Sequence, residues 1–259
     1  MMYAGCDLGT VTAKMVIMDK DEILASEVLV YKNLPKQAAG DVFESVLSAA
    51  GLAPDQIDYC VATGFGKQAV PFADANSPEV VCLNRAFRML DPEVKTIIDA
   101  GGQSMRAINI NQKGKVIDST ANEKCAAGTG KFIEVMARAL ELSLDEVSQL
   151  PAKSKDPVAI TSQCGVFAES EVITYVNDGK NRADIAAGIA RSVAGEMASL
   201  VRRISLDEKV ALVGGVARND GVVRYIEDEL GLKLTKLQKD PQLFGAIGAA
   251  LMAKEKHTG

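Results

Sequence analysis

The hydrophobic positions along the chain fall into short apolar runs that alternate with amphipathic stretches. Compact runs of apolar residues predict strands, and apolar residues spaced three and four apart predict helices. We expect strands at 2–9, 12–19, 23–31, 57–64, 94–102, 104–111, 115–122, 209–215 and 232–237. We expect helices at 36–50, 82–90, 131–142, 165–176, 182–204, 219–230 and 241–255. Asp240 is expected to cap the last helix, with Pro241 in its first turn. This alternation is typical of an α/β fold.

The second half of the chain repeats the beginning of the first. CDLGTVTAKMVIMD at 6–19 and IIDAGGQSMRAINI at 97–110 each contain a hydrophobic strand, an aspartate, glycines and a second strand. Glycines let a backbone approach phosphate groups, and Asp7 and Asp99 are suited to hold a hydrated Mg²⁺ ion. We therefore expect a duplicated fold in which two hairpins face each other across a cleft.

Two further glycine-containing segments follow in the second half. LVGGVARND at 212–220 is a strand that ends in paired glycines before a helix, which suits it to carry an adenosine. DPQLFGAIGAALMA at 240–253 predicts a helix with small residues that permit close packing, namely Gly245, Gly248 and Ala249.

Composition and charge exclude several classes of protein. The chain has 259 residues, of which 47% are hydrophobic and 24% charged, as in ordinary soluble globular proteins of one large or two moderate domains. No apolar run approaches the roughly 18–20 residues of a membrane helix, and the N-terminus lacks the basic region of a signal peptide. The net charge of −5, without a basic stripe, argues against a nucleic-acid partner. One histidine, His257, leaves little scope for histidine acid–base chemistry.

The five cysteines divide into two groups. Without a secretory signal they indicate reduced thiols in a cytoplasmic protein. Cys6, Cys60 and Cys82 lie in apolar runs and are expected to be small buried hydrophobes. Cys125 and Cys164 instead lie in turns before predicted helices.

The segment KCAAGTGKF, residues 124–132, is not a P-loop. A P-loop has glycine five residues before its Gly-Lys pair and serine or threonine directly after it. Here Cys125 occupies the first of these positions and Phe132 the second. The cysteine therefore needs another explanation.

The four glycine-containing segments, in this order, resemble the acetate/sugar kinase, Hsp70 and actin superfamily of ATPases. Within it, NEKCAAGTGKF, SQCGVFAESEVI, GGVARN and GAIGAAL resemble the ATP-dependent activators of 2-hydroxyacyl-CoA dehydratases and the related ATPase subunits of benzoyl-CoA reductase. The resemblance implies two ribonuclease H-like domains, 1–94 with 241–259 and 95–240, that bind ATP and Mg²⁺ in the cleft.

The same resemblance assigns Cys125 and Cys164 to a metal centre. In the activators each protomer of a homodimer supplies two cysteines to one [4Fe–4S] cluster that bridges the subunits, and two thiolates are half of a Cys₄ set. It also implies an electron donor, ferredoxin or flavodoxin, and a dehydratase or related reductase as partner. Helix N-termini next to both cysteines would stabilise an anionic cluster. Apolar stripes should support the two helices: Phe132, Val135, Met136, Ala139 and Leu140 in the first, and Val166, Phe167, Val172 and Ile173 in the second.

The resemblance also implies the residues of an ATP site. The first hairpin contributes Asp7, Gly9, Thr10, Val11, Thr12, Ala13 and Lys14, with Lys14 as a charge for phosphate. The second contributes Asp99, Gly101, Gly102 and Gln103, with Asp7, Asp99 and Gln103 catalytic and Gln103 suited to orient the attacking water. Gly214, Gly215, Arg218 and Gln242 complete the set. Family members usually have aspartate where this chain has Ser104, and often glutamine where it has Arg218.

These observations leave three functions open. The first is an ATPase that drives one-electron transfer into a dehydratase, either as an activator or as a reductase subunit. The second is a small-molecule kinase of the same superfamily, although no substrate-binding insertion is evident. The third is a nucleotide-sensing module without catalysis.

Overall fold

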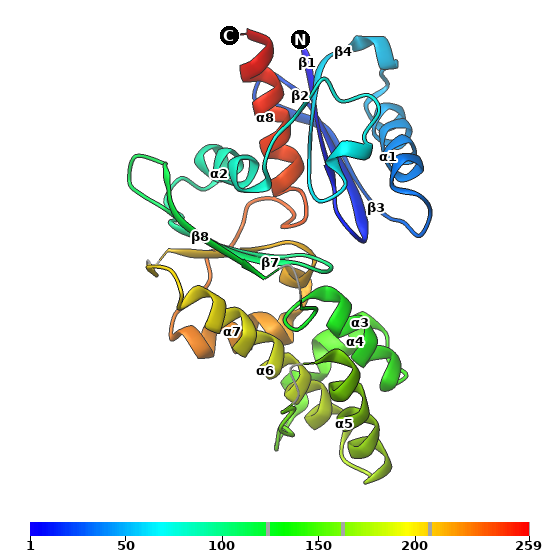
Figure 1. Ribbon diagram of the computed structural model, residues 1–259, viewed down its shortest axis with the longest axis vertical. Helices are drawn as coiled ribbons and strands as arrows, with labels where there is room; N and C mark the ends of the chain where they lie inside the picture. The colour runs from blue at the N-terminus through cyan, green and yellow to red at the C-terminus, as the bar shows by residue number, and fades with distance from the viewer. Residues whose placement is uncertain (123–124, 162–163, 207–208, 259) are drawn as a thin grey trace. The chain divides into compact units, whose positions relative to one another are not determined.

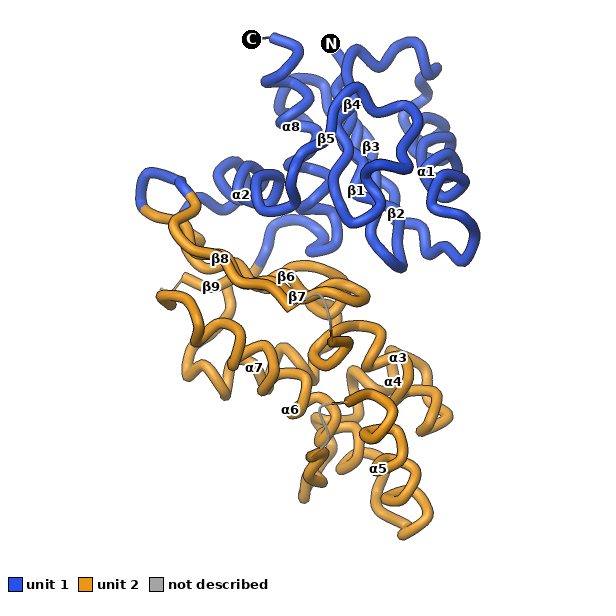
Figure 2. Tube along the Cα trace, viewed as in Figure 1, with its two compact units in different colours: residues 1–93, 112–115, 237–259 blue, residues 94–111, 116–236 orange. Residues whose placement is uncertain are grey.

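The computed structural model describes residues 1–122, 125–161, 164–206 and 209–258. Glu123 and Lys124 of NEKCAAGTGKF, and Ser162 and Gln163 of SQCGVFAESEVI, therefore lie outside the described residues. The chain forms two compact units (Figure 2): unit 1 comprises residues 1–93, 112–115 and 237–259, and unit 2 comprises 94–111 and 116–236. Within the described ranges, no helix has the length and apolar character needed to cross a membrane.

Unit 1 is built on a mixed sheet in the order β3-β2-β1-β4-β5 (Figure 1). Its strands are β1 (Met2–Leu8), β2 (Thr12–Asp19), β3 (Glu22–Val30), β4 (Ile57–Thr63) and β5 (Ala75–Asn76). Its helices are α1 (Pro35–Ala50), α2 (Glu79–Leu90) and α8 (Phe244–Thr258), with 3₁₀ turns at Pro54–Gln56 and Lys67–Ala69.

Alternation along β1 explains why helices cover both faces of this sheet. Ala4 and Cys6 join a buried cluster with Val42 of α1, whereas Gly5, between them, faces the other side of the sheet. A Cβ atom on Gly5 would lie 2.1 Å from the Ala246 carbonyl oxygen, so glycine lets α8 approach the strand backbone. Helices α1 and α8 accordingly lie on opposite sides of the sheet (Figure 1).

Unit 2 repeats this topology with the order β8-β7-β6-β9. The strands are β6 (Thr96–Ala100), β7 (Met105–Ile110), β8 (Val116–Asn122) and β9 (Val210–Val213). The helices are α3 (Gly130–Ala139), α4 (Leu144–Gln149), α5 (Gly165–Asn177), α6 (Arg182–Val201) and α7 (Asp220–Leu230), with 3₁₀ turns at Leu150–Lys153 and Gly215–Arg218. In each unit an antiparallel meander pairs through its first strand with a parallel strand, β4 or β9. The predicted duplicated α/β fold is therefore confirmed.

The predicted strand at 232–237 is wrong. Its leucines alternate as expected, and Thr235 N–H donates to the Val210 carbonyl over 2.7 Å. Leu234 N–H, however, donates to the carboxylate of Glu227 over 3.0 Å instead of to a strand. The N–H group that strand pairing would use is thus bonded to a side chain of α7, and the segment is irregular.

Helix α4 has no counterpart among the predicted helices. Helix α8 begins later than predicted. The Asp240 carboxylate accepts from Gln242 N–H over 3.0 Å, and its carbonyl accepts from Leu243 N–H over 3.0 Å. These bonds close a separate turn, so Asp240 does not cap the helix that begins at Phe244.

Close packing of α8 on α2 at Gly248 yields a stability prediction. A Cβ atom on Gly248 would lie 1.8 Å from the Cys82 carbonyl oxygen. Gly248→Ala should therefore lower the free energy of unfolding, measured by urea denaturation, by about 1–3 kcal/mol or more. Gly40→Ala in α1 is the control: a Cβ there meets nothing within 4 Å, and removing a helical glycine should stabilise by up to about 1 kcal/mol. Wild-type stability of Gly248→Ala would contradict this packing.

Candidate functional site

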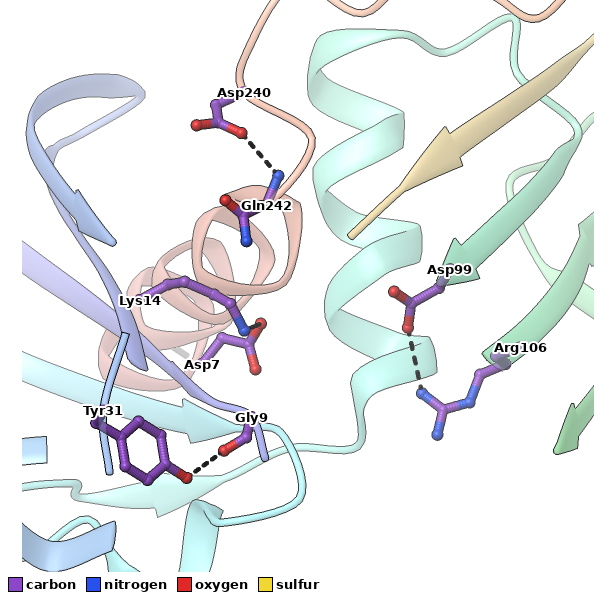
Figure 3. A network of polar contacts seen from close by, with 8 residues as sticks. All are labelled: Asp7, Gly9, Lys14, Tyr31, Asp99, Arg106, Asp240 and Gln242. Atoms are coloured by element: carbon purple, nitrogen blue, oxygen red, sulfur yellow. Dashed lines mark hydrogen bonds and ion pairs between the residues drawn. The ribbon is translucent and has the colours of Figure 1, made fainter. Parts of the chain in front are cut away.

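An ion pair joins the two strands of the first hairpin. Asp7, at the end of β1, lies directly opposite Lys14 of β2 in the strand register. Lys14 Nζ is 3.1 Å from Asp7 Oδ2 (Figure 3), and the two side chains are only 11% and 16% exposed. A nearly buried pair such as this holds a positive and a negative charge in fixed positions, where an anion or a hydrated cation can meet them.

The predicted phosphate residues form the turn above this pair. Gly9 N–H donates to the Thr12 carbonyl over 3.0 Å, which leaves Thr10 and Val11 at the tip. A Cβ on Gly9 would lie 3.0 Å from Lys14 Nζ, so glycine makes room for the ammonium beside the turn. The side chain of Ala13 is buried in the core and contributes packing.

Two glycines that sequence reasoning did not assign to the site surround Asp7. Cβ atoms on Gly64 and Gly245 would lie 2.5 Å and 2.7 Å from its carboxylate oxygens. Gly64 also has a positive φ of 90°, which favours glycine. Gln242 lies three residues before Gly245, in the turn that leads into α8. Asp7 is thus enclosed by backbone from β4 and α8.

The second hairpin carries an equivalent pair. Asp99 of β6 lies opposite Arg106 of β7 in the register, and Arg106 Nη1 is 3.7 Å from Asp99 Oδ2 (Figure 3). Gly101 N–H donates to the Ser104 carbonyl over 2.9 Å, and Gln103 is exposed in the turn. Sequence reasoning missed Arg106, although a basic residue seven positions after the aspartate in both repeats, Lys14 and Arg106, was the available signal.

Helix α3 is attached to this second turn. Gly130 N–H donates to the Gly101 carbonyl over 2.9 Å, and Lys131 N–H donates to the Gly102 carbonyl over 2.8 Å. The N-terminus of α3 therefore points at the hairpin, and Cys125 lies five residues before the helix begins. The first two N–H groups of α3 thus bond to the hairpin, and whether this helix N-terminus stabilises a cluster at Cys125 stays a prediction.

The predicted adenosine segment also lies against the second hairpin. Gly214 has a φ of 89°, and a Cβ there would lie 2.3 Å from the Ala100 carbonyl oxygen. A Cβ on Gly130 would meet Val216 at 3.8 Å and Gly101 at 3.4 Å. Gly214 and the 3₁₀ turn that runs from Gly215 to the exposed Arg218 thus share one region of unit 2 with the Gly101–Gly102 turn.

The cysteines divide as the sequence indicated. Cys6, Cys60 and Cys82 are buried. Burial raises the pKa of the Cys6 thiol to about 12 and raises the pKa values of Cys60 and Cys82 as well, so these groups stay protonated at neutral pH. Cys125 is half-buried, and its N–H donates to Asn122 Oδ1 over 3.2 Å. Cys164 is exposed directly before α5, as expected, and its carbonyl accepts from Ala168 N–H over 2.9 Å.

The first turn of α5 presents apolar side chains to the surface. Val172 is buried, but Val166, Phe167 and Ile173 are 69%, 67% and 45% exposed in the single chain. The prediction that these three support the helix from within is wrong. Two large apolar residues next to an exposed thiol form instead an uncovered surface beside Cys164.

Among the described residues, no group of three or more His, Cys, Asp or Glu side chains is arranged to hold a metal ion.

Comparison with known sequences identifies relatives over the full fold. The model of the BadF/BadG/BcrA/BcrD ATPase family matches residues 4–253. The activator of lactoyl-CoA dehydratase from Anaerotignum propionicum is 40% identical over 98% of this chain and 98% of its own length. One of the subunits of benzoyl-CoA reductase from Thauera aromatica is 31% identical over 98% of this chain and 93% of its own.

Comparison with solved structures identifies the same kind of relative. The activator of the 2-hydroxyisocaproyl-CoA dehydratase from Clostridium difficile, with bound ADPNP, has a TM-score of 0.95 and 38% identity, covering 100% of this chain and 96% of that one. A ROK family glucokinase from Streptomyces griseus has a TM-score of 0.61 at 11% identity, covering 98% of this chain and 100% of that one. The latter likeness supports the predicted superfamily fold and carries nothing about activity.

Proposed function

This chain belongs to the BadF/BadG/BcrA/BcrD ATPase family, and from this premise we propose that it is an activator of a 2-hydroxyacyl-CoA dehydratase. It would hydrolyse ATP and use the resulting conformational change to drive one electron into the dehydratase. The observation that carries the proposal is the direct attachment of α3 to the Gly101–Gly102 turn, because it connects a phosphate-type hairpin to the segment that contains Cys125.

We assign the nucleotide site to the two hairpins and the adenosine segment. In the first hairpin, Lys14 Nζ and the turn at Thr10 to Thr12 offer positive charge and N–H groups to phosphate. Asp7 and Asp99 keep 16% and 20% of their side chains exposed, which suits ligands that reach a hydrated Mg²⁺ ion through water. The ADPNP in the Clostridium difficile activator supports an adenine nucleotide as the ligand.

The chemistry requires a water to attack the γ-phosphorus of ATP, releasing ADP and inorganic phosphate. Little covalent help is needed from the protein, which must position the water and balance charge. Gln103 is exposed in the second turn and carries an amide that suits orientation of this water. Arg106, fixed opposite Asp99, adds positive charge beside the same turn.

We assign Cys125 and Cys164 to a [4Fe–4S] cluster shared by two copies of the chain. The residues fit this group only in a dimer, because one copy supplies two thiols and a cubane takes four. Val166 and Phe167, exposed beside Cys164, are the kind of surface that a second copy would cover. A cluster held there would supply a single electron at low potential to the dehydratase, after reduction by a ferredoxin or flavodoxin.

The chain's own contribution is the link between the two sites. Because the amides of Gly130 and Lys131 bond to the second turn, movement of that turn when nucleotide binds would carry α3 with it. The residues between Cys125 and α3 form a tight turn, in which Thr129 N–H donates to the Ala126 carbonyl over 3.0 Å. ATP would thus favour one placement of Cys125 by its differential affinity for that state.

A second candidate is an ATPase subunit of a benzoyl-CoA-reductase-type enzyme, which the likeness to the reductase subunit from Thauera aromatica supports. The two functions differ in assembly: an activator would form a homodimer, whereas a reductase subunit would belong to a heteromeric complex. Anaerobic purification of the tagged protein from its native host separates them by the proteins that co-elute.

The cluster assignment predicts the iron content of cysteine variants. Cys125→Ser or Cys164→Ser removes two of the four ligands from a symmetric dimer, so iron should fall from about four atoms per dimer to near zero, and the dimer should weaken. Iron analysis and gel filtration under anaerobic conditions measure both quantities. Cys60→Ala, which removes a buried thiol, should keep its iron. Full iron in either serine variant would rule out a cluster ligated by these cysteines.

The nucleotide assignment predicts the behaviour of Asp7→Asn. The substitution keeps the size of the side chain but removes the negative charge that pairs with Lys14 and would bind hydrated Mg²⁺. We expect the rate of MgATP hydrolysis to fall roughly 100-fold or more, while iron content stays at the wild-type value. Asp58→Asn, at an exposed carboxylate of the same unit, is the matched control. Hydrolysis near the wild-type rate in Asp7→Asn would exclude the first hairpin as the phosphate site.

A further inference from the structure

Tyr31 holds the tip of the first hairpin at two points. Its hydroxyl donates to the Gly9 carbonyl over 2.5 Å (Figure 3), and its backbone N–H donates to the Val11 carbonyl over 3.1 Å. Tyr31 follows β3 directly and its ring packs against the buried cluster of unit 1. Tyr31, 22 positions from Gly9, therefore contributes to the structure of a turn in which the local backbone hydrogen bonds are incomplete.

The incomplete bonding of the turn is what makes the hydroxyl important. Gly9 N–H donates to the Thr12 carbonyl, but the reciprocal bond, from Thr12 N–H to the Gly9 carbonyl, is not made between these two described residues. An ordinary two-residue hairpin would use it. Here the Tyr31 hydroxyl takes the place of Thr12 as donor to that carbonyl.

Planarity of the peptide bond then sets the direction of two amides. In a trans peptide the N–H points opposite to the C=O of the same unit. Because the Gly9 carbonyl accepts from the Tyr31 hydroxyl and the Val11 carbonyl from its backbone N–H, the Thr10 N–H points away from the hydroxyl and the Thr12 N–H points away from the backbone amide. Backbone N–H groups of one glycine-containing turn can form an anion-binding concavity, and the ammonium of Lys14 lies beside Gly9 in the same turn.

We propose that Tyr31 is a positioning residue, which sets the Thr10 and Thr12 amides to receive the phosphate groups of the nucleotide. The inference rests on the proposed function, in that it takes the first hairpin as the phosphate site. Burial raises the pKa of the Tyr31 phenol above its ordinary value of 10.0, against an opposite effect of Lys14, so the hydroxyl keeps its proton and donates at neutral pH.

The test compares Tyr31→Phe with Tyr175→Phe in the intact holoprotein. Tyr31→Phe keeps the packed ring and removes only the hydroxyl. Tyr175→Phe removes a similar hydrogen bond, made to the Ala159 carbonyl over 2.8 Å in unit 2. Calorimetry with adenosine, AMP, ADP and MgATP gives the dissociation constants, and steady-state hydrolysis gives KM and kcat separately.

In Tyr31→Phe we expect the dissociation constant and KM for MgATP to rise about 3- to 10-fold. This is the loss of affinity that corresponds to the net contribution of one hydrogen bond. Adenosine affinity should not change, and Tyr175→Phe should match the wild type. If Tyr31 had only a structural role, Tyr31→Phe would lower thermal stability without weakening MgATP binding more than adenosine binding. Unchanged nucleotide binding in Tyr31→Phe, or an equal loss for adenosine and ATP, would overturn the inference.

Failure of the proposed function would look different. If the wild type and Asp7→Asn hydrolyse MgATP equally, the first hairpin is not the phosphate site and the premise is lost. If Asp7→Asn is inactive while Tyr31→Phe binds all ligands normally, only the role of Tyr31 is wrong.

Discussion

The two hydrogen bonds from the start of α3 to the Gly101–Gly102 turn are the constraint on which the proposed mechanism depends. The donors are N–H groups of the first helical turn, which have no acceptor within the helix. Their acceptors are backbone carbonyls of the hairpin, so α3 is attached to the hairpin. Phe132 and Met136 bury one face of α3, so the helix transmits displacement as a unit. On its other side, a short turn leads back to Cys125, which Asn122 holds at the end of β8. In the proposed mechanism, a change at the hairpin would therefore reach the cysteine through a short hydrogen-bonded path.

Duplication explains why each unit has a charged pair at the same place. In both hairpins the aspartate is the penultimate residue of the first strand and a cation lies directly across from it, as Lys14 does for Asp7 and Arg106 for Asp99. Each pair supplies a carboxylate and a fixed positive charge next to a glycine turn. The two pairs differ in their surroundings: Asp7 is enclosed by Gly64 and Gly245, whereas the second turn is tied to α3. Both repeats are thus suited to take part in the proposed nucleotide site, and the second is in addition tied to α3.

Strand–turn–strand periodicity was enough to predict both sheets and most helices, because these elements bury apolar residues at regular spacing. The errors arose where a single side chain decides the local structure. Glu227 takes the amide of Leu234 from a strand that the alternation predicted, and Asp240 closes a turn ahead of α8. The expectation that Val166 and Phe167 support their helix from within is wrong because apolar spacing alone cannot distinguish a buried face from an exposed one. Tyr31 carried no sequence signal, since its partner is a backbone carbonyl 22 residues away.

Coupling between nucleotide and cluster is the central claim, and a redox titration measures it most directly. The midpoint potential of the anaerobically purified protein is determined with and without a saturating non-hydrolysable ATP analogue. Linked sites typically differ by about 1–3 kcal/mol, which for one electron is a shift of roughly 40–130 mV. Reduction should change the affinity for the analogue by the same free energy. Identical potentials with the analogue demonstrably bound would mean that the cysteines only join the two subunits, and ATP-gated electron transfer would be wrong.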